Sequence, residues 1–419
     1  MQNTYQYWRA AHPLVFITLH LLLGIALASI LQKPIPFTTP IFSFFTISIE
    51  LFLMLLCTKL NAPPFVKGVF VFMCLLSWGM MLKWNAIEKS NFELPTSINM
   101  RIVYCRNWII DKLNRNIPSK QANGFAQALL IGVKMDMNKA LLNAYTQLGI
   151  IHIIAISGMH IDILFKSMSK LLGLLPQKKL FKVFEIVSLL LLVWIYTFIA
   201  NAGPSIIRAS VFFSLFLLGR FFMLSKFTLN SIAGGIFLLL ISNVGGIENI
   251  GLQLSYAAVI GIHLFYKIIY KSIPIDNPLI LFLWSNCCIS LAAQITTFPI
   301  LILHFHQVAA WVLVSNFIMV PLSNIILYGL IILLLLPSQL AFYWGMIIER
   351  YILFFNHLIQ NWFIQTKAAT IHIAMGPFQV FMYYLMLLYA YLWIYQKKPR
   401  YLIVIIGLVV CYNIIKLFS

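Results

Sequence analysis

The residues of this sequence that could do chemistry are polar side chains set inside long apolar stretches. The densest group lies in the segment 149–162, where two histidines, a serine, an aspartate and two glycines interrupt an otherwise apolar run. A polar group in hydrocarbon costs free energy unless it is paired or hydrated, so such residues usually face a cavity or a partner. The positions concerned are His152, Ser157, Gly158, His160 and Asp162.

Further polar groups follow between residues 201 and 324. One short turn leads into a helix with an arginine a turn inside its start. Such a guanidinium can bind phosphate through two hydrogen bonds or extend to the lipid headgroups. A glutamine and a tyrosine three residues apart share one face of a later helix. The candidate residues of these groups are Ser205, Arg208, Gln253, Ser255, Tyr256, Gln294, Thr297 and Asn316.

Gly158 favours a break in the helix over 149–162. Broken membrane helices direct backbone amides and carbonyls toward a cavity, which is how many membrane proteins build a substrate site. We therefore predict a broken or re-entrant helix whose polar side chains converge on a central cavity with Gln253 and Gln294. The alternative for His152 and Ser157 is hydrogen bonding between helices. If Asp162 is buried without a cation, we expect conduction to depend on pH.

Several kinds of site are missing from the sequence. It has no GxxxxGK[ST] loop and no GxGxxG turn, so we expect neither ATP hydrolysis nor a dinucleotide. The six cysteines lie mostly in apolar runs without a CxxC pair and are interpreted as reduced packing residues. We expect no catalytic residue, no metal and no cofactor.

The composition excludes a water-soluble globule, because 62% of the 419 residues are hydrophobic and only 9% are charged. We predict an all-α polytopic integral membrane protein with roughly 11–13 transmembrane or re-entrant helices, since that many apolar windows could cross ~30 Å of hydrocarbon. The windows are 14–31, 41–57, 65–82, 148–175, 183–200, 205–222, 227–242, 250–271, 279–303, 308–336, 376–395 and 401–418.

Four segments need separate treatment. The window 308–336 is too long for one ordinary span and carries Pro321 near its middle, so we predict a hairpin or re-entrant pair there. The first window is predicted to be an uncleaved anchor rather than a signal peptide. The segments 100–116 and 340–366 are predicted as interfacial amphipathic helices, with an imperfect span as the alternative for the second.

Basic residues in short loops set the predicted orientation. The net charge is +19, and several clusters are expected to be cytoplasmic. The N-terminus is then inside, and the segment 83–147 and the C-terminus are periplasmic. The loop cations are Lys166, Lys170, Lys178, Lys179, Lys182, Arg220, Lys226, Lys397, Lys398 and Arg400.

We divide the chain into four parts. These are N-terminal transmembrane helices (1–84), a periplasmic segment with an amphipathic helix (85–147), a channel core (148–336), and a C-terminal amphipathic helix with the last spans (337–419).

Five ordered motifs resemble the ComEC-type competence protein family, whose members form the inner-membrane channel that internalises transforming DNA as a single strand. They extend over about residues 125–336, and each is weak alone. The matching residues are Gly149, His152, Ala155, Ser157, Gly158 and His160; Ser205, Arg208 and Ala209, with Gly219 and Arg220 closing that helix; Gln253, Leu254, Ser255, Tyr256 and Ala258; Ala293, Gln294, Thr297 and Pro299; and Asn316 and Pro321.

The resemblance implies a channel in the inner (plasma) membrane that is not an enzyme. It also implies a separate periplasmic DNA receptor or pilus, a separate nuclease and a cytoplasmic helicase motor as partners, besides single-stranded DNA and membrane lipid. The oligomeric state is left open.

The sequence departs from this family in several places. The stretch 85–120 is too short for the outer oligonucleotide-binding barrel of long members, and the H-x-H-x-D-H zinc signature of their hydrolase domain has no match, so we expect a short form. Asp162 stands where a small neutral residue is usual. Asn243 and Val244 stand where Asp-Pro or Asn-Pro is commoner.

Two rival functions follow from the same residues. An ion- or proton-coupled small-solute transporter could use His152, Asp162 and Arg208 as its coupling site. An intramembrane serine hydrolase would use Ser157 as nucleophile with a histidine of another helix as base, but no oxyanion motif supports it. A channel for single-stranded DNA needs a wide polar path with basic residues and aromatic faces, and the basic excess and 15% aromatic content are compatible with it without being specific to it.

Overall fold

The computed structural model describes residues 13–31, 71, 74–75, 77–79, 96–133, 139–174, 179–221, 227–242, 248–366 and 370–418. The predicted span 41–57, most of 65–82, the boundary at 84/85, Lys178, Lys226, Asn243 and Val244 lie outside these residues. Of Arg220 only the backbone is described.

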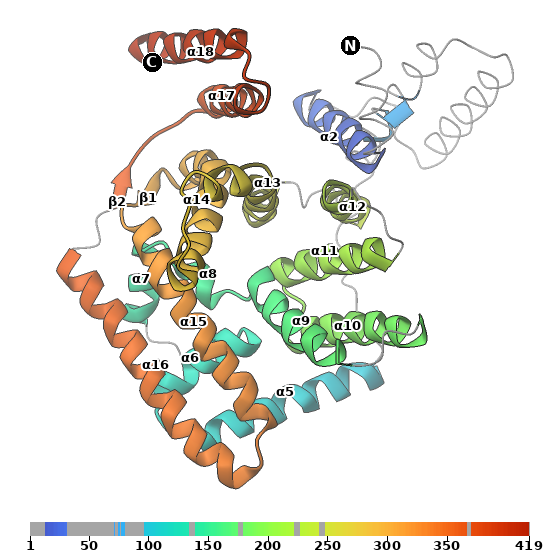
Figure 1. Cartoon of the computed structure of the whole chain (residues 1–419), viewed down its shortest axis with the longest axis vertical. Helices are drawn as coiled ribbons and strands as arrows, with labels where there is room; N and C mark the ends of the chain where they lie inside the picture. Colours follow the sequence, from blue (N-terminus) through green and yellow to red (C-terminus); the bar gives the residue numbers. More distant parts are fainter. Residues whose placement is uncertain are drawn as a thin grey trace, which may run out of the picture. The chain divides into compact units, whose positions relative to one another are not determined.

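The described chain is almost entirely helical (Figure 1), which confirms the predicted all-α class. The helices are α2 (Pro13–Leu31), α5 (Thr96–Asn116), α6 (Lys120–Ile131), α7 (Lys139–Gln147), α8 (Ile151–Ile154), α9 (Gly158–Leu172), α10 (Lys179–Ile199), α11 (Pro204–Phe221), α12 (Phe227–Ser242), α13 (Ile250–Tyr270), α14 (Pro278–Phe305), α15 (Val312–Leu335), α16 (Ser338–Thr366), α17 (Pro377–Gln396) and α18 (Pro399–Phe418).

Within the described residues, five helices are long and apolar enough to cross a membrane. They are α13, α14, α15, α17 and residues 181–199 of α10. Apolar stretches of α2, α11, α12 and α18 are shorter. The protein is therefore a polytopic membrane protein, as the composition predicts.

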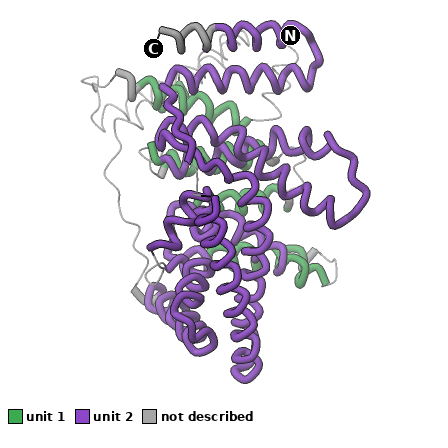
Figure 2. The backbone as a smooth tube through the Cα atoms, turned by 90° about the vertical axis from the view of Figure 1, so that its left-hand side faces the viewer, with its two compact units in different colours: residues 1–96, 168–194, 207–249 green, residues 97–167, 195–206, 250–419 purple. Residues whose placement is uncertain are grey.

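The chain divides into two compact units (Figure 2). Unit 1 comprises residues 1–96, 168–194 and 207–249. In it, α2 packs on α12, and the hydroxyl of Thr18 donates a hydrogen bond to the carbonyl of Ala233 at 3.0 Å.

Unit 2 comprises residues 97–167, 195–206 and 250–419. Its core is built from apolar side chains of α5, α6, α7, α8, α15 and α16, and the rings of Phe125, Tyr145 and Phe355 meet within it. This core surrounds the start of the polar segment 149–162, so that segment begins on a rigid support.

The predicted hairpin within 308–336 is wrong. α15 is one continuous helix of 24 residues that passes through Pro321. A proline removes one helical hydrogen bond, and membrane helices tolerate this loss because their surroundings re-satisfy the freed groups. The hairpin turn lies instead between α15 and α16, which run side by side in Figure 1.

A two-stranded antiparallel sheet, which was not predicted from the sequence, joins the segment before α15 to the segment after α16. Strand β1 (Gln307–Ala309) precedes α15 and strand β2 (Thr370–His372) follows α16, with Val308 opposite Ile371. The chain therefore leaves and returns at the same end of α14. The predicted orientation of α17 and α18 therefore does not need a hairpin inside 308–336.

The two predicted amphipathic segments both form helices. α5 buries Leu113 in the core of unit 2 and exposes Met100 and Tyr104, whereas α16 buries Phe355 and exposes Tyr343 and Ile347. Each helix thus has a packed face and an apolar outer face. Their interfacial position stays a prediction.

Two cations of α5 bind the carboxyl ends of other helices. Arg106 donates to the carbonyls of Phe198 and Ile199 at the end of α10, at 3.0 and 2.8 Å. Lys112 donates to the carbonyls of Leu334 and Leu336 at the end of α15, at 2.8 and 2.9 Å. Cations stabilise helix C-termini in this way because unpaired carbonyls carry partial negative charge. α5 thereby joins two helix ends of unit 2.

Candidate functional site

The polar segment begins at a tight turn that α15 holds in place. Gly149 has φ 74°, in the left-handed region that favours glycine. A Cβ at this position would lie 2.7 Å from a methyl carbon of Val312. The hydroxyl of Ser315 donates to the carbonyl of Leu148 at 2.7 Å. Only glycine fits this turn, and Ser315 ties it to α15.

The predicted break in the helix is confirmed. α8 ends at Ile154, residues 155–157 are not helical, and α9 begins at Gly158. The amide of Ala155 donates to the carbonyl of Ile151 at 3.3 Å and closes α8. Three residues thus leave the helical conformation without any proline.

Ser157 and His160 build the start of α9. The imidazole Nδ1 of His160 accepts a hydrogen bond from the backbone N–H of Ser157 at 3.2 Å and lies 3.4 Å from its hydroxyl. A side chain at the third helical position that binds the N-cap amide is one half of a capping box, a role usually taken by Glu or Gln. The His160 side chain is fully buried. The Ser-Gly-x-His pattern therefore fixes where the second helix starts.

The end of α6 supports the break from one side. Gly132, with φ 76°, ends α6, and a Cβ there would lie 2.9 Å from the side chain of Ile156. The hydroxyl of Tyr196 donates to the carbonyl of Leu130 at 2.9 Å. The nonhelical residues thus rest on a helix terminus that is itself capped.

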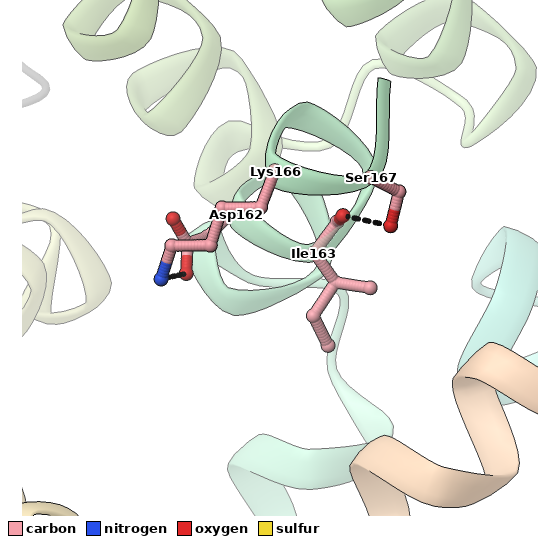
Figure 3. Close-up of polar contacts among 4 residues, drawn as sticks. All are labelled: Asp162, Ile163, Lys166 and Ser167. Carbon is pink, nitrogen blue, oxygen red and sulfur yellow. Dashed lines mark hydrogen bonds and ion pairs between the residues drawn. The ribbon is translucent and has the colours of Figure 1, made fainter. Parts of the chain in front are cut away.

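The remaining polar side chains of the segment differ in their surroundings. His152 on α8 is exposed. Asp162 on α9 is partly exposed, and its carboxylate accepts an ion-pair hydrogen bond from Lys166 at 2.7 Å (Figure 3). The condition under which we expected pH-dependent conduction, an Asp162 buried without a cation, is not met.

The second polar group lies at the start of α11 and in the turn before it. Asn201 and Ala202 have left-handed backbones, and the Ala202 amide donates to the carbonyl of Thr197 at 2.8 Å. Ser205 is half-buried and Arg208 is buried, with 7% of its surface exposed. A buried guanidinium does not extend along the surface to the headgroups, which argues against the snorkelling alternative.

The third and fourth groups meet because α13 and α14 pack closely. The Gln253 oxygen lies 3.3 Å from Nε2 of His304. The hydroxyl of Thr296 donates to the carbonyl of Ala257 at 2.7 Å, opposite Gly261, where a Cβ would collide with Thr296. The predicted residue Thr297 donates a hydrogen bond within its own helix, to the carbonyl of Ala293 at 3.0 Å.

The other candidates occupy intermediate or buried positions. Tyr256 is buried with 8% exposure, whereas Ser255 and Gln294 are half-buried. Asn316 on α15 is 7% exposed, and its side-chain oxygen has no hydrogen-bond partner within the described part of the chain. The convergence of the segment 149–162 with Gln253 and Gln294 stays a prediction.

Three residues that hold the site together belong to the same polar groups of the sequence but were not among the predicted candidates. Thr296, His304 and Ser315 stand next to the predicted positions but make the contacts between segments. Helical periodicity about Gln253 places residues on a face but does not show which neighbour faces them. Among the described residues, no group of three His, Cys, Asp or Glu side chains could hold a metal ion.

The chain belongs to the competence protein family. The model of that family matches residues 129–398, well over half of the chain, and this range contains all five motifs. ComE operon protein 3 of Bacillus subtilis (strain 168) is 27% identical over 287 residues, which is 67% of this chain and 34% of that protein. The chain thus spans about a third of this curated relative's length. No solved structure matches.

Proposed function

We propose that this chain forms the path by which transforming DNA crosses the inner membrane as a single strand. Membership in the competence protein family supports a role in DNA uptake. The observation that carries the channel role is the break at 155–157, which interrupts the helix beside His152 and Ser157 inside the matched region. A re-entrant, polar interruption is the means by which membrane proteins line a hydrophilic path.

The proposed orientation places the N-terminus in the cytoplasm and the C-terminus in the periplasm. Basic residues within 166–182 and 397–400, at and near the ends of helices, support it through the positive-inside rule. The pairing of β1 with β2 adds support, because it returns the chain to the end of α14 before α17 begins. α17 then runs inward and α18 outward.

A solute transporter coupled through His152, Asp162 and Arg208 is less well supported. Asp162 is held by Lys166 on its own helix, whereas a coupling carboxylate must exchange its partner during transport. We also propose that the chain is not an enzyme. The lone pair of His160 Nδ1 accepts a hydrogen bond from the backbone N–H of Ser157. That imidazole is therefore poorly placed as a base for the serine hydroxyl.

On this proposal the chain depends on other proteins for every chemical step. A periplasmic receptor or pilus would deliver DNA, a separate nuclease would remove one strand, and a cytoplasmic helicase would pull the other. Phosphates would meet Arg208 along the path or at its mouth.

The test is natural transformation in a competent strain that lacks a second copy of the gene. Deleting the gene should abolish transformation, and normal transformation would overturn the proposal. Arg208→Ala at normal membrane abundance should reduce transformation nearly to the deletion level. Arg208→Lys should cause a partial loss, because it keeps the charge but loses the planar fork.

A further inference from the structure

One end of unit 2 combines exposed cations with stacked aromatic rings. The turn between α13 and α14 and the turn between α17 and α18 carry this surface, which we name the Tyr–Lys surface. Its cations are Lys267, Lys271, Lys397, Lys398 and Arg400, all exposed. Its rings are Tyr266, Tyr270, Tyr389, Tyr391, Tyr395 and Tyr401.

Contacts along the helices place the two turns at the same end. The ring of Tyr391 on α17 meets that of Phe265 on α13, with centroids 6.1 Å apart. One helical turn and a half further along, each of these helices ends. Towards the other end of α14, the hydroxyl of Tyr383 donates to the carbonyl of Ile295 at 3.2 Å. α13 and α17 therefore run in the same direction and finish side by side.

The rings are arranged in pairs beside the cations. Tyr266 and Tyr270 stack with centroids 5.4 Å apart, and Tyr391 and Tyr395 stack at 6.1 Å. The guanidinium of Arg400 lies 5.0 Å from the Tyr401 ring centroid. Tyr395 is 78% exposed. Flat faces are thus available at the outer rim of the surface.

The charge of this surface is largely uncompensated. Asp276 is an acidic residue in the same turn as Lys271. None of the five cations forms an ion pair with a carboxylate of the described chain. Such a surface attracts an extended polyanion, and the adjoining rings can stack with planar groups of that polyanion.

We propose that the Tyr–Lys surface receives single-stranded DNA where it leaves the path on the cytoplasmic side. The proposal rests on the proposed function and adds a binding site to it. Cations that only set topology need no ordered rings, and tyrosines that only anchor the protein at the interface need not stack in pairs. Cations alternating with stacked aromatic faces are the combination used by proteins that bind single strands without sequence preference.

The test measures binding by the full chain in nanodiscs of phosphatidylcholine, a neutral lipid. The probe is a fluorescent oligothymidylate of about 20 nucleotides, longer than one typical binding site. The variant Lys271→Gln, Lys397→Gln, Lys398→Gln and Arg400→Gln removes four cations from the surface. The matched control, Arg101→Gln, Arg115→Gln, Lys120→Gln and Lys139→Gln, removes four exposed cations from α5, α6 and α7.

The surface variant should bind at least about tenfold more weakly. The negative slope of log affinity against log salt should become shallower by about 3, because each lost phosphate contact removes roughly 0.7 from its magnitude. The control should stay within about threefold of the parent chain. Equal losses in both variants would show only a general charge effect and would overturn the proposal.

A second probe separates stacking from charge. A strand of the same length without bases should bind the parent chain at least about fivefold more weakly than oligothymidylate, and Tyr395→Ala should remove that difference. If base-bearing and abasic strands bind alike, no stacking site exists. If the surface variant instead loses phosphatidylglycerol and keeps its DNA affinity, the surface binds anionic lipid.

The result can be told apart from a failure of the proposed function. Normal DNA binding by the surface variant overturns the exit site but leaves the transformation phenotype of the deletion untouched. No DNA binding by the parent chain also overturns the exit site, and the deletion then decides independently whether the chain takes part in uptake.

Discussion

Helical backbone is interrupted in two regions of this molecule, and the interruptions differ in kind. At 155–157 the chain leaves the helix although no proline is near. In α14 and α15 the helix continues through Pro299 and Pro321. Proline, the residue type usually expected to break a helix, therefore does not interrupt these two helices, whereas the helix is interrupted at a Ser-Gly-x-His sequence.

The difference lies in which groups satisfy the backbone. Pro299 has no backbone N–H and cannot donate a hydrogen bond to the carbonyl of Ile295. The hydroxyl of Tyr383 on α17 donates to that carbonyl instead, at 3.2 Å. The helix can then continue. At 155–157 the segment closes its own two helix ends, through Ala155 and through the pairing of Ser157 with His160. Each helix end has its own closing hydrogen bond, so the break forms without a proline.

Removing the cap of α9 should have the largest effect. His160→Ala loses the acceptor for the Ser157 amide and leaves a cavity at a fully buried site, so we expect a loss of about 2–3 kcal/mol in stability. His160→Gln keeps a neutral acceptor at the same helical position and should recover about half of it. Thermal unfolding in detergent, followed by tryptophan fluorescence, measures both. Equal midpoints for the two variants would show that a hydrogen-bond acceptor at position 160 does not stabilise the start of α9.

The proline of α15 offers the opposite test. Pro321→Ala should leave the fold unchanged and raise the stability by about 1 kcal/mol, because an interior proline costs up to about 3 kcal/mol and the surroundings recover part of that cost. A higher unfolding midpoint with unchanged transformation is the expected outcome. Collapse of the protein would mean that Pro321 shapes a bend on which function depends.

These two regions also show how far sequence reasoning reaches. Composition and apolar windows predict the membrane class and most described helices, because burial in lipid depends on the side chains alone. The break was predicted from Gly158 and its polar neighbours, which are local. The hairpin at Pro321 was wrong because the continuity of a helix also depends on groups outside it. Thr296 and Ser315 were missed for the same reason, since their partners belong to other segments of the chain.

A double-mutant cycle sharpens the account of Pro299. Tyr383→Phe should cost about 0.6–1 kcal/mol in the parent chain, the usual range for a hydrogen bond between membrane helices. In the Pro299→Ala background the new backbone N–H at position 299 can donate a hydrogen bond to the Ile295 carbonyl. Tyr383→Phe should then cost close to nothing. Unfolding midpoints of the four proteins give the coupling. Additive effects would mean that Tyr383 does not compensate for the proline.

Substituting Asp162 is expected to have the smallest effect on stability and transformation, whereas the alternative transporter function predicts a large effect on transport at this position. The carboxylate is partly exposed and paired with Lys166 one turn along the same helix (Figure 3). Pairs of this kind contribute about 0.3–0.5 kcal/mol, so Asp162→Asn should change stability by no more than that. Transformation should stay within about twofold of the parent, with the same dependence on pH between about pH 6 and pH 8. Lys166→Gln is the matched control, because it breaks the same pair from the other side and should behave alike. A loss of uptake confined to Asp162→Asn would show that the carboxylate itself carries ions or protons along the path, and the channel proposal would give way to the coupled transporter.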